Sequence, residues 1–154
     1  MAISPLFKKL NLKDQRTIFV LDAPASFEAE IERLEGVDVR RTLPSSTDAT
    51  FLLAFVMRKP QIDVVAVKLA RIAPGDPVVW FAYPKGTSKR YKSEIDRDTG
   101  WAALGAAGFE GVRMVAIDED WSAARFRRAE FIKTMRRDRA HTLSRAGKAR
   151  TARK

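Results

Sequence analysis

Residues 51–57, Phe-Leu-Leu-Ala-Phe-Val-Met, form the longest uninterrupted apolar run of the chain. The run is far too short to span a bilayer, for which about 20 apolar residues are needed. It also lacks the alternation that marks a strand with one wet face. Short continuous apolar runs of this kind are typical of strands covered on both faces, as in parallel sheets flanked by helices. The run therefore predicts a buried strand of an α/β fold.

The segments on either side of this run alternate between strand and helix patterns. Further strands are predicted at 17–21, 37–43, 78–83, 112–117 and 121–128. Helices are predicted from Ser26, as an N-cap, to about residue 34, from Pro60 to residue 72, and around residues 101–104. This order predicts a three-layer α/β domain with a Rossmann-like, mostly parallel sheet. The short turn at 118–120 predicts an antiparallel C-terminal hairpin at or near the sheet edge.

Composition limits the chemistry available to the chain. Its 154 residues fit a single domain, which we expect to occupy 1–128. With no cysteine and one histidine, His141, the chain cannot form disulfides, thiolate sites or multi-histidine metal sites. We expect no bound metal and no cofactor. The first residues do not resemble a secretory signal, and we expect a cytoplasmic protein without a membrane span.

The net charge of +10 is confined to the end of the chain. Residues 1–124 carry seventeen basic and seventeen acidic side chains, whereas 125–154 carry twelve basic and two acidic ones. Clustered positive charge attracts phosphate polymers. We therefore expect RNA or DNA to bind the basic tail, 129–154, together with the end of the last strand. The predicted contact residues are Arg125, Arg127, Arg128, Lys133, Arg136, Arg137, Arg139, Arg145, Lys148, Arg150, Arg153 and Lys154.

Two other uses of the tail stay open. It could attach to an anionic membrane surface, although its apolar content is low for insertion. It could also be a disordered, solubilising extension. The spacing of Phe131, Ile132 and Met135 would allow its first part to form one or two helical turns against the body.

Two sequence clusters resemble a known family. One is Trp80-Phe81-Ala82-Tyr83-Pro84-Lys85, and the other runs from Asp118 to Phe126. With Leu21-Asp22-Ala23-Pro24 and a helical start near residues 6–12, they resemble small bacterial proteins that contain a domain of unknown function. The likeness covers about residues 5–128. It implies a Rossmann-like domain in a bacterial protein and implies no activity.

The first strand-to-helix turn does not favour a nucleotide cofactor. It reads Asp22-Ala23-Pro24-Ala25-Ser26, without the glycines of a dinucleotide site, and Pro24 has no N–H to donate. The second predicted strand carries Arg40 and Arg41 where an acid would hold a ribose.

The loop at residues 84–93 is the best candidate site of the body, because ligands of open α/β sheets bind beyond the carboxyl ends of strands. Its cations, hydroxyls and glycine could bind an anion, helped by the N-terminus of a helix beginning at Ser93 or Thr99. The alternative is a solvated surface loop. The anion-binding candidates are Lys85, Gly86, Thr87, Ser88, Lys89, Arg90 and Lys92.

Two further clusters have structural interpretations. Asp118, Glu119 and Asp120 could hold Mg²⁺, but consecutive acids of this kind are typical turn residues. Trp80, Trp101 and Trp121 could stack on bases, but their apolar-periodic positions predict core packing.

The leading hypothesis is a non-catalytic protein that binds nucleic acid or another anion. One rival is a small enzyme or degenerate methyltransferase-like domain, with a pocket bordered by Lys85, Asp22 and Asp118. Another is an interaction module whose edge strand pairs with a partner.

Overall fold

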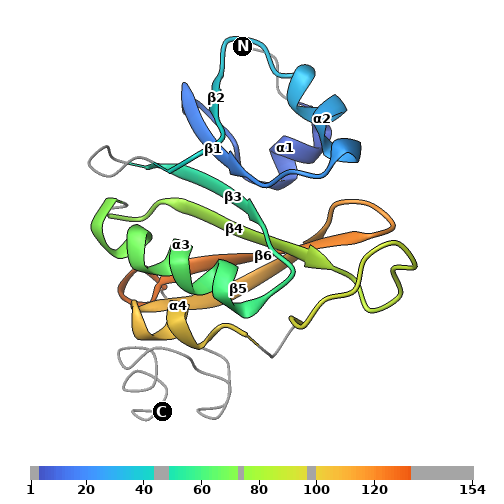
Figure 1. Ribbon diagram of the computed structural model, residues 1–154. Helices are drawn as coiled ribbons and strands as arrows, with labels where there is room; N and C mark the ends of the chain where they lie inside the picture. Colours follow the sequence, from blue (N-terminus) through green and yellow to red (C-terminus); the bar gives the residue numbers. More distant parts are fainter. Residues whose placement is uncertain (1–3, 44–48, 73–74, 97–99, 133–154) are drawn as a thin grey trace.

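The computed structural model describes residues 4–43, 49–72, 75–96 and 100–132 (Figure 1). Its strands are β1 (Thr17–Leu21), β2 (Asp38–Arg40), β3 (Phe51–Phe55), β4 (Val78–Pro84), β5 (Phe109–Ala116) and β6 (Trp121–Arg128). Its helices are α1 (Pro5–Lys9), α2 (Ala25–Glu32), α3 (Lys59–Ile72) and α4 (Ala102–Ala106), followed by the 3₁₀ turn η1 (Ala129–Phe131).

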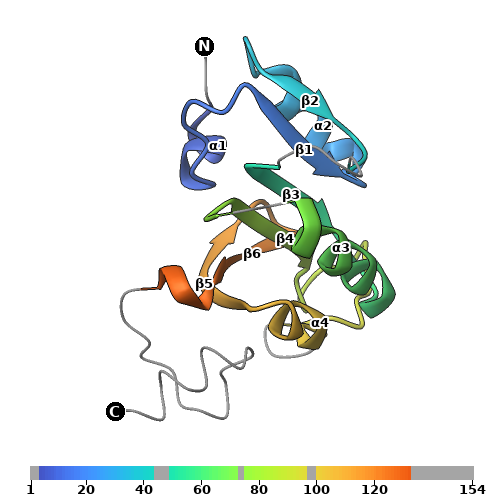
Figure 2. The same ribbon diagram turned by 90° about the vertical axis from the view of Figure 1, so that its left-hand side faces the viewer.

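The six strands form one sheet in the order β2-β1-β3-β4-β6-β5. The strands β2, β1, β3 and β4 are parallel to their neighbours, whereas β6 is antiparallel to both β4 and β5. In Figure 2, α1 lies on the opposite side of the sheet from α3 and α4. These features confirm the predicted three-layer, Rossmann-like α/β class with a C-terminal antiparallel hairpin.

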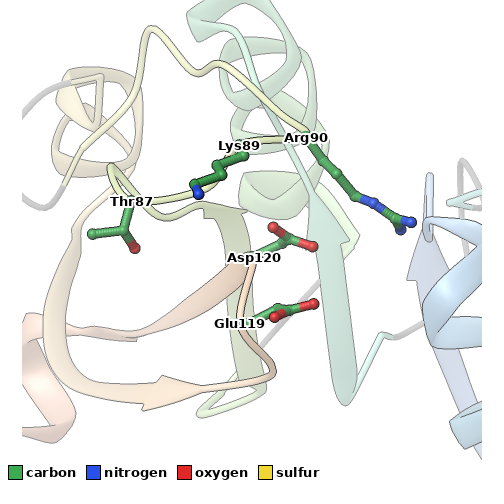
Figure 3. A pocket seen from close by; sticks show the side chains of 5 residues that line it. All are labelled: Thr87, Lys89, Arg90, Glu119 and Asp120. Atoms are coloured by element: carbon green, nitrogen blue, oxygen red, sulfur yellow. The ribbon is translucent and has the colours of Figure 1, made fainter.

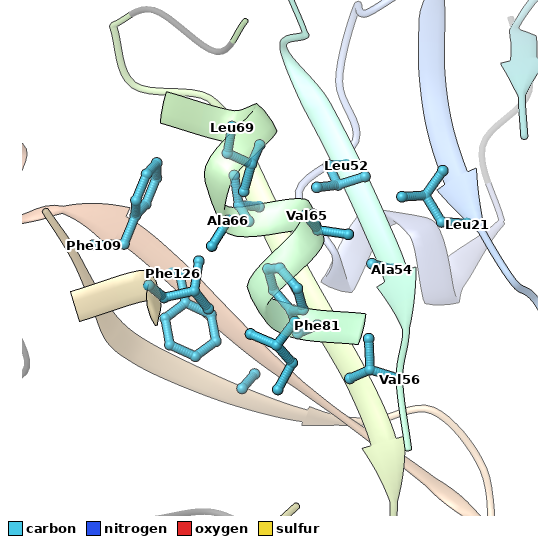
Figure 4. Packing of buried hydrophobic residues seen from close by; sticks show 14 of the residues in the cluster. Leu21, Leu52, Ala54, Val56, Val65, Ala66, Leu69, Phe81, Phe109 and Phe126 are labelled. Atoms are coloured by element: carbon cyan, nitrogen blue, oxygen red, sulfur yellow. The ribbon is translucent and has the colours of Figure 1, made fainter. Parts of the chain in front are cut away.

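Each face of the sheet has its own hydrophobic cluster. One cluster joins α3 and α4 to alternate residues of the strands, among them Leu52, Phe81 and Phe126 (Figure 4). The other cluster joins α1 and α2 to the remaining strand residues, which point to the opposite face of the sheet, such as Leu53 and Trp80. All five residues of β3 are buried, as the apolar run predicted. The Trp80 indole also donates a 2.7 Å hydrogen bond to the Leu10 carbonyl, which ties the segment after α1 to the sheet.

The edge strand β5 changes face along its length. Phe109 belongs to the cluster under α3 and α4, whereas Val115 belongs to the opposite cluster. Residues six positions apart on a regular strand share a face, but the pairing with β6 shifts register between Gly111 and Arg113. This irregularity also interrupts the edge at which a partner strand would pair.

Several predicted boundaries were wrong. The helix α2 begins at Ala25 with Pro24 as its N-cap, not Ser26. The strand predicted at 37–43 is limited to β2, Asp38–Arg40. Arg40, at its end, and the following Arg41 are both exposed. The described part of the chain contains no helix with the length and apolarity to cross a bilayer.

Candidate functional site

The loop that follows β4 and the turn between β5 and β6 lie together. They meet because β6 lies between β4 and β5, with Tyr83 opposite Ser122 and Pro84 opposite Trp121. The carboxyl end of β4 is therefore next to the start of β6. The Lys85 backbone N–H donates a 2.7 Å hydrogen bond to the Asp120 carbonyl, which extends this pairing into the loop.

Ser88 connects the two segments through its side chain. Its hydroxyl donates to Asp120 Oδ1 at 2.8 Å and accepts from the Tyr91 backbone N–H at 3.2 Å. The Tyr91 ring packs on Trp121, with ring centroids 5.0 Å apart. The loop is thus held to the turn by the hydrogen bonds of Ser88 and by the contact of the Tyr91 ring with Trp121.

A cavity of about 400 Å³ lies between the loop and the turn, lined by Thr87, Lys89, Arg90, Glu119 and Asp120 (Figure 3). The loop supplies the two cations and the turn supplies the two carboxylates. Within the described residues, no ion pair joins the cations to these carboxylates. The cavity therefore offers charges of both signs to a small polar molecule.

Among the seven predicted anion-binding residues, Thr87, Lys89 and Arg90 line this cavity. Ser88 instead binds Asp120, and Lys85 and Lys92 are not among the lining residues. Gly86 is outside the left-handed region, and a Cβ there would meet no atom within 4 Å. Neither its backbone conformation nor a close approach requires a glycine, so the loop does not resemble a phosphate cradle.

Among the described residues, no helix begins in or directly after this loop at Ser93. The helix that follows the loop, α4, has five residues and begins at Ala102 rather than at Ser93. Ser93 instead forms a tight turn in which its hydroxyl accepts from the Ile95 N–H at 2.9 Å. The expectation that a helix dipole beginning at Ser93 assists anion binding was therefore wrong; Thr99, the other expected start, lies outside the described residues.

Two acids of the turn, Asp118 and Asp120, have structural roles. Asp118 Oδ1 accepts hydrogen bonds from the N–H groups of Asp120 and Trp121, at 2.8 and 2.9 Å. This is the turn chemistry predicted from sequence. In the parts of the chain that the structure describes, no group of three or more His, Cys, Asp or Glu side chains is arranged to hold a metal ion. The three tryptophans are at most 4% exposed, so the predicted core packing is confirmed.

The strand order reverses between β1 and β3, and β3 leads there into α3. Gln61 Oε1 accepts from the N–H groups of Met57 and Arg58 at 2.7 and 2.9 Å, which satisfies donors at the start of α3. At the end of β2, Arg40 pairs with Asp38. The neighbouring Arg41 is held by Glu28.

The three arginines of β6 differ in their surroundings. Arg127 donates through Nε and Nη2 to the Asp76 carboxylate, at 3.1 and 2.6 Å, and these hydrogen bonds raise the pKa of Arg127. Arg128 donates to the Gly75 carbonyl at 2.7 Å and lies over the Phe109 ring, 4.9 Å from its centroid. Both therefore have partners within the body.

Arg125 has no such partner. It is half-buried, and its Nε is shielded from solvent without a hydrogen bond in the described part of the chain. Burial, together with the positive charges of Arg127 and Arg113, lowers the pKa of Arg125, and the negative charge of Asp76 opposes this shift. The remaining predicted nucleic-acid contacts, Lys133, Arg136, Arg137, Arg139, Arg145, Lys148, Arg150, Arg153 and Lys154, lie outside the described residues, as does Met135.

Sequence reasoning missed Arg113 as a neighbour of Arg125. The signal that could have found it is the hairpin itself, since antiparallel pairing from a short turn places residues of β5 opposite residues of β6. The pairing is regular from the turn as far as Arg113, with Ala116 opposite Ser122 and Met114 opposite Ala124, so counting back from the turn would have placed Arg113 opposite Arg125.

No protein-family model matches the chain, and neither does any curated protein. Two solved structures are similar in part. A protein described as a type 11 methyltransferase, from Sulfolobus solfataricus, has 11% identity and a TM-score of 0.46, with 82% of this chain and 89% of that chain covered. The N-methyltransferase NodS from Bradyrhizobium japonicum WM9 has 16% identity and a TM-score of 0.40, with 71% and 72% covered. Similarity at this level carries no argument about activity.

Proposed function

We propose that this protein is a non-catalytic nucleic-acid-binding protein whose basic C-terminal segment, residues 125–154, contacts the phosphate backbone. The observation that carries the proposal is the confinement of the +10 net charge to this segment. Clustered Lys and Arg side chains bind phosphates with little dependence on sequence, and binding releases counterions. Binding without sequence preference therefore suits the composition of the segment.

At one end of the segment, on β6, the structure limits which arginines can contact a phosphate. The Asp76 carboxylate and the Gly75 carbonyl engage Arg127 and Arg128, so Arg125 is the β6 arginine whose Nε has no hydrogen-bond partner among the described residues. The main contribution to affinity is then expected from the residues after 132.

Deletion of residues 136–154 tests the proposal. This deletion removes eight of the twelve basic residues of the segment. The full chain should bind mixed-sequence RNA or DNA at low salt, and the truncated chain should lose at least tenfold in affinity. As a matched control, a full-length variant with these eight residues changed to Gln should behave like the deletion. Equal binding by all three proteins would refute the proposal.

A second candidate is supported by the cavity beside β4: a small enzyme or degenerate methyltransferase-like domain that takes a small polar ligand between Lys89, Arg90, Glu119 and Asp120. Thermal-shift titration with S-adenosylmethionine and with anionic and zwitterionic metabolites tests it. A ligand of this site should raise the Tm of the wild type, and Lys89→Gln with Arg90→Gln should abolish that rise. An unchanged response in this double variant would remove the cavity from consideration.

Membership of the small bacterial Rossmann-like family that the sequence resembles stays part of the proposal, as does a cytoplasmic location.

A further inference from the structure

Arg113 of β5 and Arg125 of β6 are direct cross-strand partners. Side chains in such pairs point to the same face of the sheet, with Cβ atoms about 5 Å apart. Two like charges in this relationship destabilise a sheet unless a counter-charge lies between them. On the other side of β6, Arg125 is opposite the buried Trp80, so its guanidinium has an apolar neighbour there.

The acids near this pair lie at the Arg127 end of the strand. Asp76 is engaged by Arg127. Glu110 is fully buried and is the cross-strand partner of Arg127. This pair is further from the turn than the pair of Arg113 and Arg125. Within the described residues, neither Arg113 nor Arg125 forms an ion pair or a side-chain hydrogen bond. Asp76 attracts Arg125 electrostatically, but no acid of the described residues forms an ion pair with either arginine of the pair.

The pair lies on a part of the sheet that the described helices do not cover. Alternation along β6 puts Arg125 on the same face as Ala123, which is the face of α1 and α2. Figures 1 and 2 both show α1 and α2 beside β1 and β3, away from β5. Arg113 is exposed and Arg125 is half-exposed, so solvent reaches the pair.

We propose that Arg113 and Arg125 form a discrete site for one phosphate group, bridged between their two guanidinium groups on the open face of the β5–β6 hairpin. Guanidinium groups present paired donors that match phosphate oxygens, and hydrogen bonds between two charged partners are the stronger kind. The apolar side provided by Trp80 strengthens the attraction, because it lowers the local dielectric constant. The phosphate can belong to a nucleic-acid backbone or to a free ion, and the site does not depend on the residues after 132.

Titration of the full-length protein with sodium phosphate tests the site, observed through the Nε–Hε signals of its arginines by NMR. Sodium chloride at matched ionic strength is the reference. The signals of Arg113 and Arg125 should shift in a saturable manner with phosphate and not with chloride. The variants Arg113→Gln and Arg125→Gln should each weaken phosphate binding at least tenfold, as expected for the loss of a hydrogen bond between charged groups.

Arg71→Gln is the matched control, since Arg71 is an exposed arginine at the end of α3. This variant should bind phosphate like the wild type. Arg113 is exposed on the edge strand, so Arg113→Gln should leave folding unchanged. This variant therefore still tests the site if Arg125→Gln affects folding. Absence of a phosphate-specific shift, or equal binding in all variants, would overturn the site. Saturation by an acidic peptide but not by phosphate would also overturn it.

A second arm distinguishes the two sources of phosphate. If a nucleic-acid backbone occupies the site, a 12-nucleotide single strand should displace inorganic phosphate from the pair, and Arg125→Gln should reduce the salt dependence of oligonucleotide binding by about one phosphate contact. If a free ion occupies it, phosphate binding persists and the oligonucleotide does not compete. Failure of the basic tail to bind nucleic acid would leave the phosphate titration unchanged, so the two proposals fail separately.

Discussion

Ser88 Oγ donates a 2.8 Å hydrogen bond to Asp120 Oδ1, and this bond joins segments that are 32 residues apart in sequence. The same oxygen accepts from the Tyr91 N–H, so one hydroxyl orders the loop after β4 and fixes it to the turn before β6. The position of Lys89 and Arg90 relative to Glu119 depends on this connection.

Ser88→Ala should lower the free energy of unfolding by about 1 kcal/mol, because it removes a part-buried hydrogen bond to a carboxylate and leaves the Tyr91 N–H unpaired. Urea denaturation of the wild type and the variant measures the difference. Ser26→Ala is the control, since Ser26 is exposed in the first turn of α2. Its effect should stay within about 0.5 kcal/mol. Equal effects of the two changes would mean that the Ser88 contact contributes no stability.

Leu69→Ala should destabilise the protein by about 2–5 kcal/mol. Leu69 lies on the buried face of α3 and is fully buried, so its truncation leaves a cavity. Val67 lies on the same helix and is 61% exposed. Val67→Ala should change stability by no more than about 0.5 kcal/mol. Thermal and urea unfolding of both variants check the expectation. A loss at Val67 as large as that at Leu69 would show that the helix buries a different face.

Gly86→Ala should be neutral or slightly stabilising, because the position has open space and needs no positive φ. Gly100→Ala should cost about 1 kcal/mol or more. Gly100 has φ +103°, and a Cβ there would lie 3.3 Å from Ile95 Cγ1. Comparison of the two unfolding curves tests both statements. A large loss at Gly86 would contradict the conformation of the candidate loop.

The Glu28–Arg41 pair should give stability a specific pH dependence. Its two hydrogen bonds, 2.7 and 2.8 Å long, lower the pKa of Glu28 below its ordinary value of 4.5, and burial opposes the shift. A carboxylate with a lowered folded pKa stabilises the protein above its unfolded pKa, and this contribution is lost as the pH falls through the folded pKa.

The difference in unfolding free energy between the wild type and Glu28→Gln should therefore be constant above about pH 5 and should shrink towards zero in acid. Urea denaturation from pH 7 to pH 3 measures it. Glu32→Gln, an exposed change on the same helix, provides the control. A difference that grows in acid would contradict the assigned pair.

The architecture was predictable where burial dictates the residue type. The apolar run 51–57 predicted the position and burial of β3, because a strand covered on both faces needs only apolar side chains. The strand ends at Phe55 rather than at Met57, which is 36% exposed. The short turn at Asp118 likewise predicted the hairpin, and Asp118 caps it as expected. The limits of β2 and α4 were less accurate. At these positions exposed, polar or small residues carry no periodic signal, and tertiary contacts decide where each element ends.

The candidate site was predictable only in its parts. Both the loop and the acidic turn were recognised, but their contact depends on β6 lying between β4 and β5. The local pattern predicts a hairpin near the edge without fixing which of its strands pairs with β4. The pairing of Arg113 with Arg125 follows from counting back along the hairpin, because the register shift lies further from the turn, between Gly111 and Arg113.

The dependence of nucleic-acid affinity on salt tests the central claim most directly. For single strands, each neutralised phosphate contributes about −0.7 to the slope of log K against log salt concentration. Fluorescence anisotropy with a mixed-sequence oligonucleotide gives this slope for the full chain and for the chain without residues 136–154. We expect a steep negative slope for the full chain, and a slope smaller by about 3 or more units after deletion. A shallow slope for the full chain, or the same slope for both, would contradict the assignment of residues 125–154 as the nucleic-acid-binding segment.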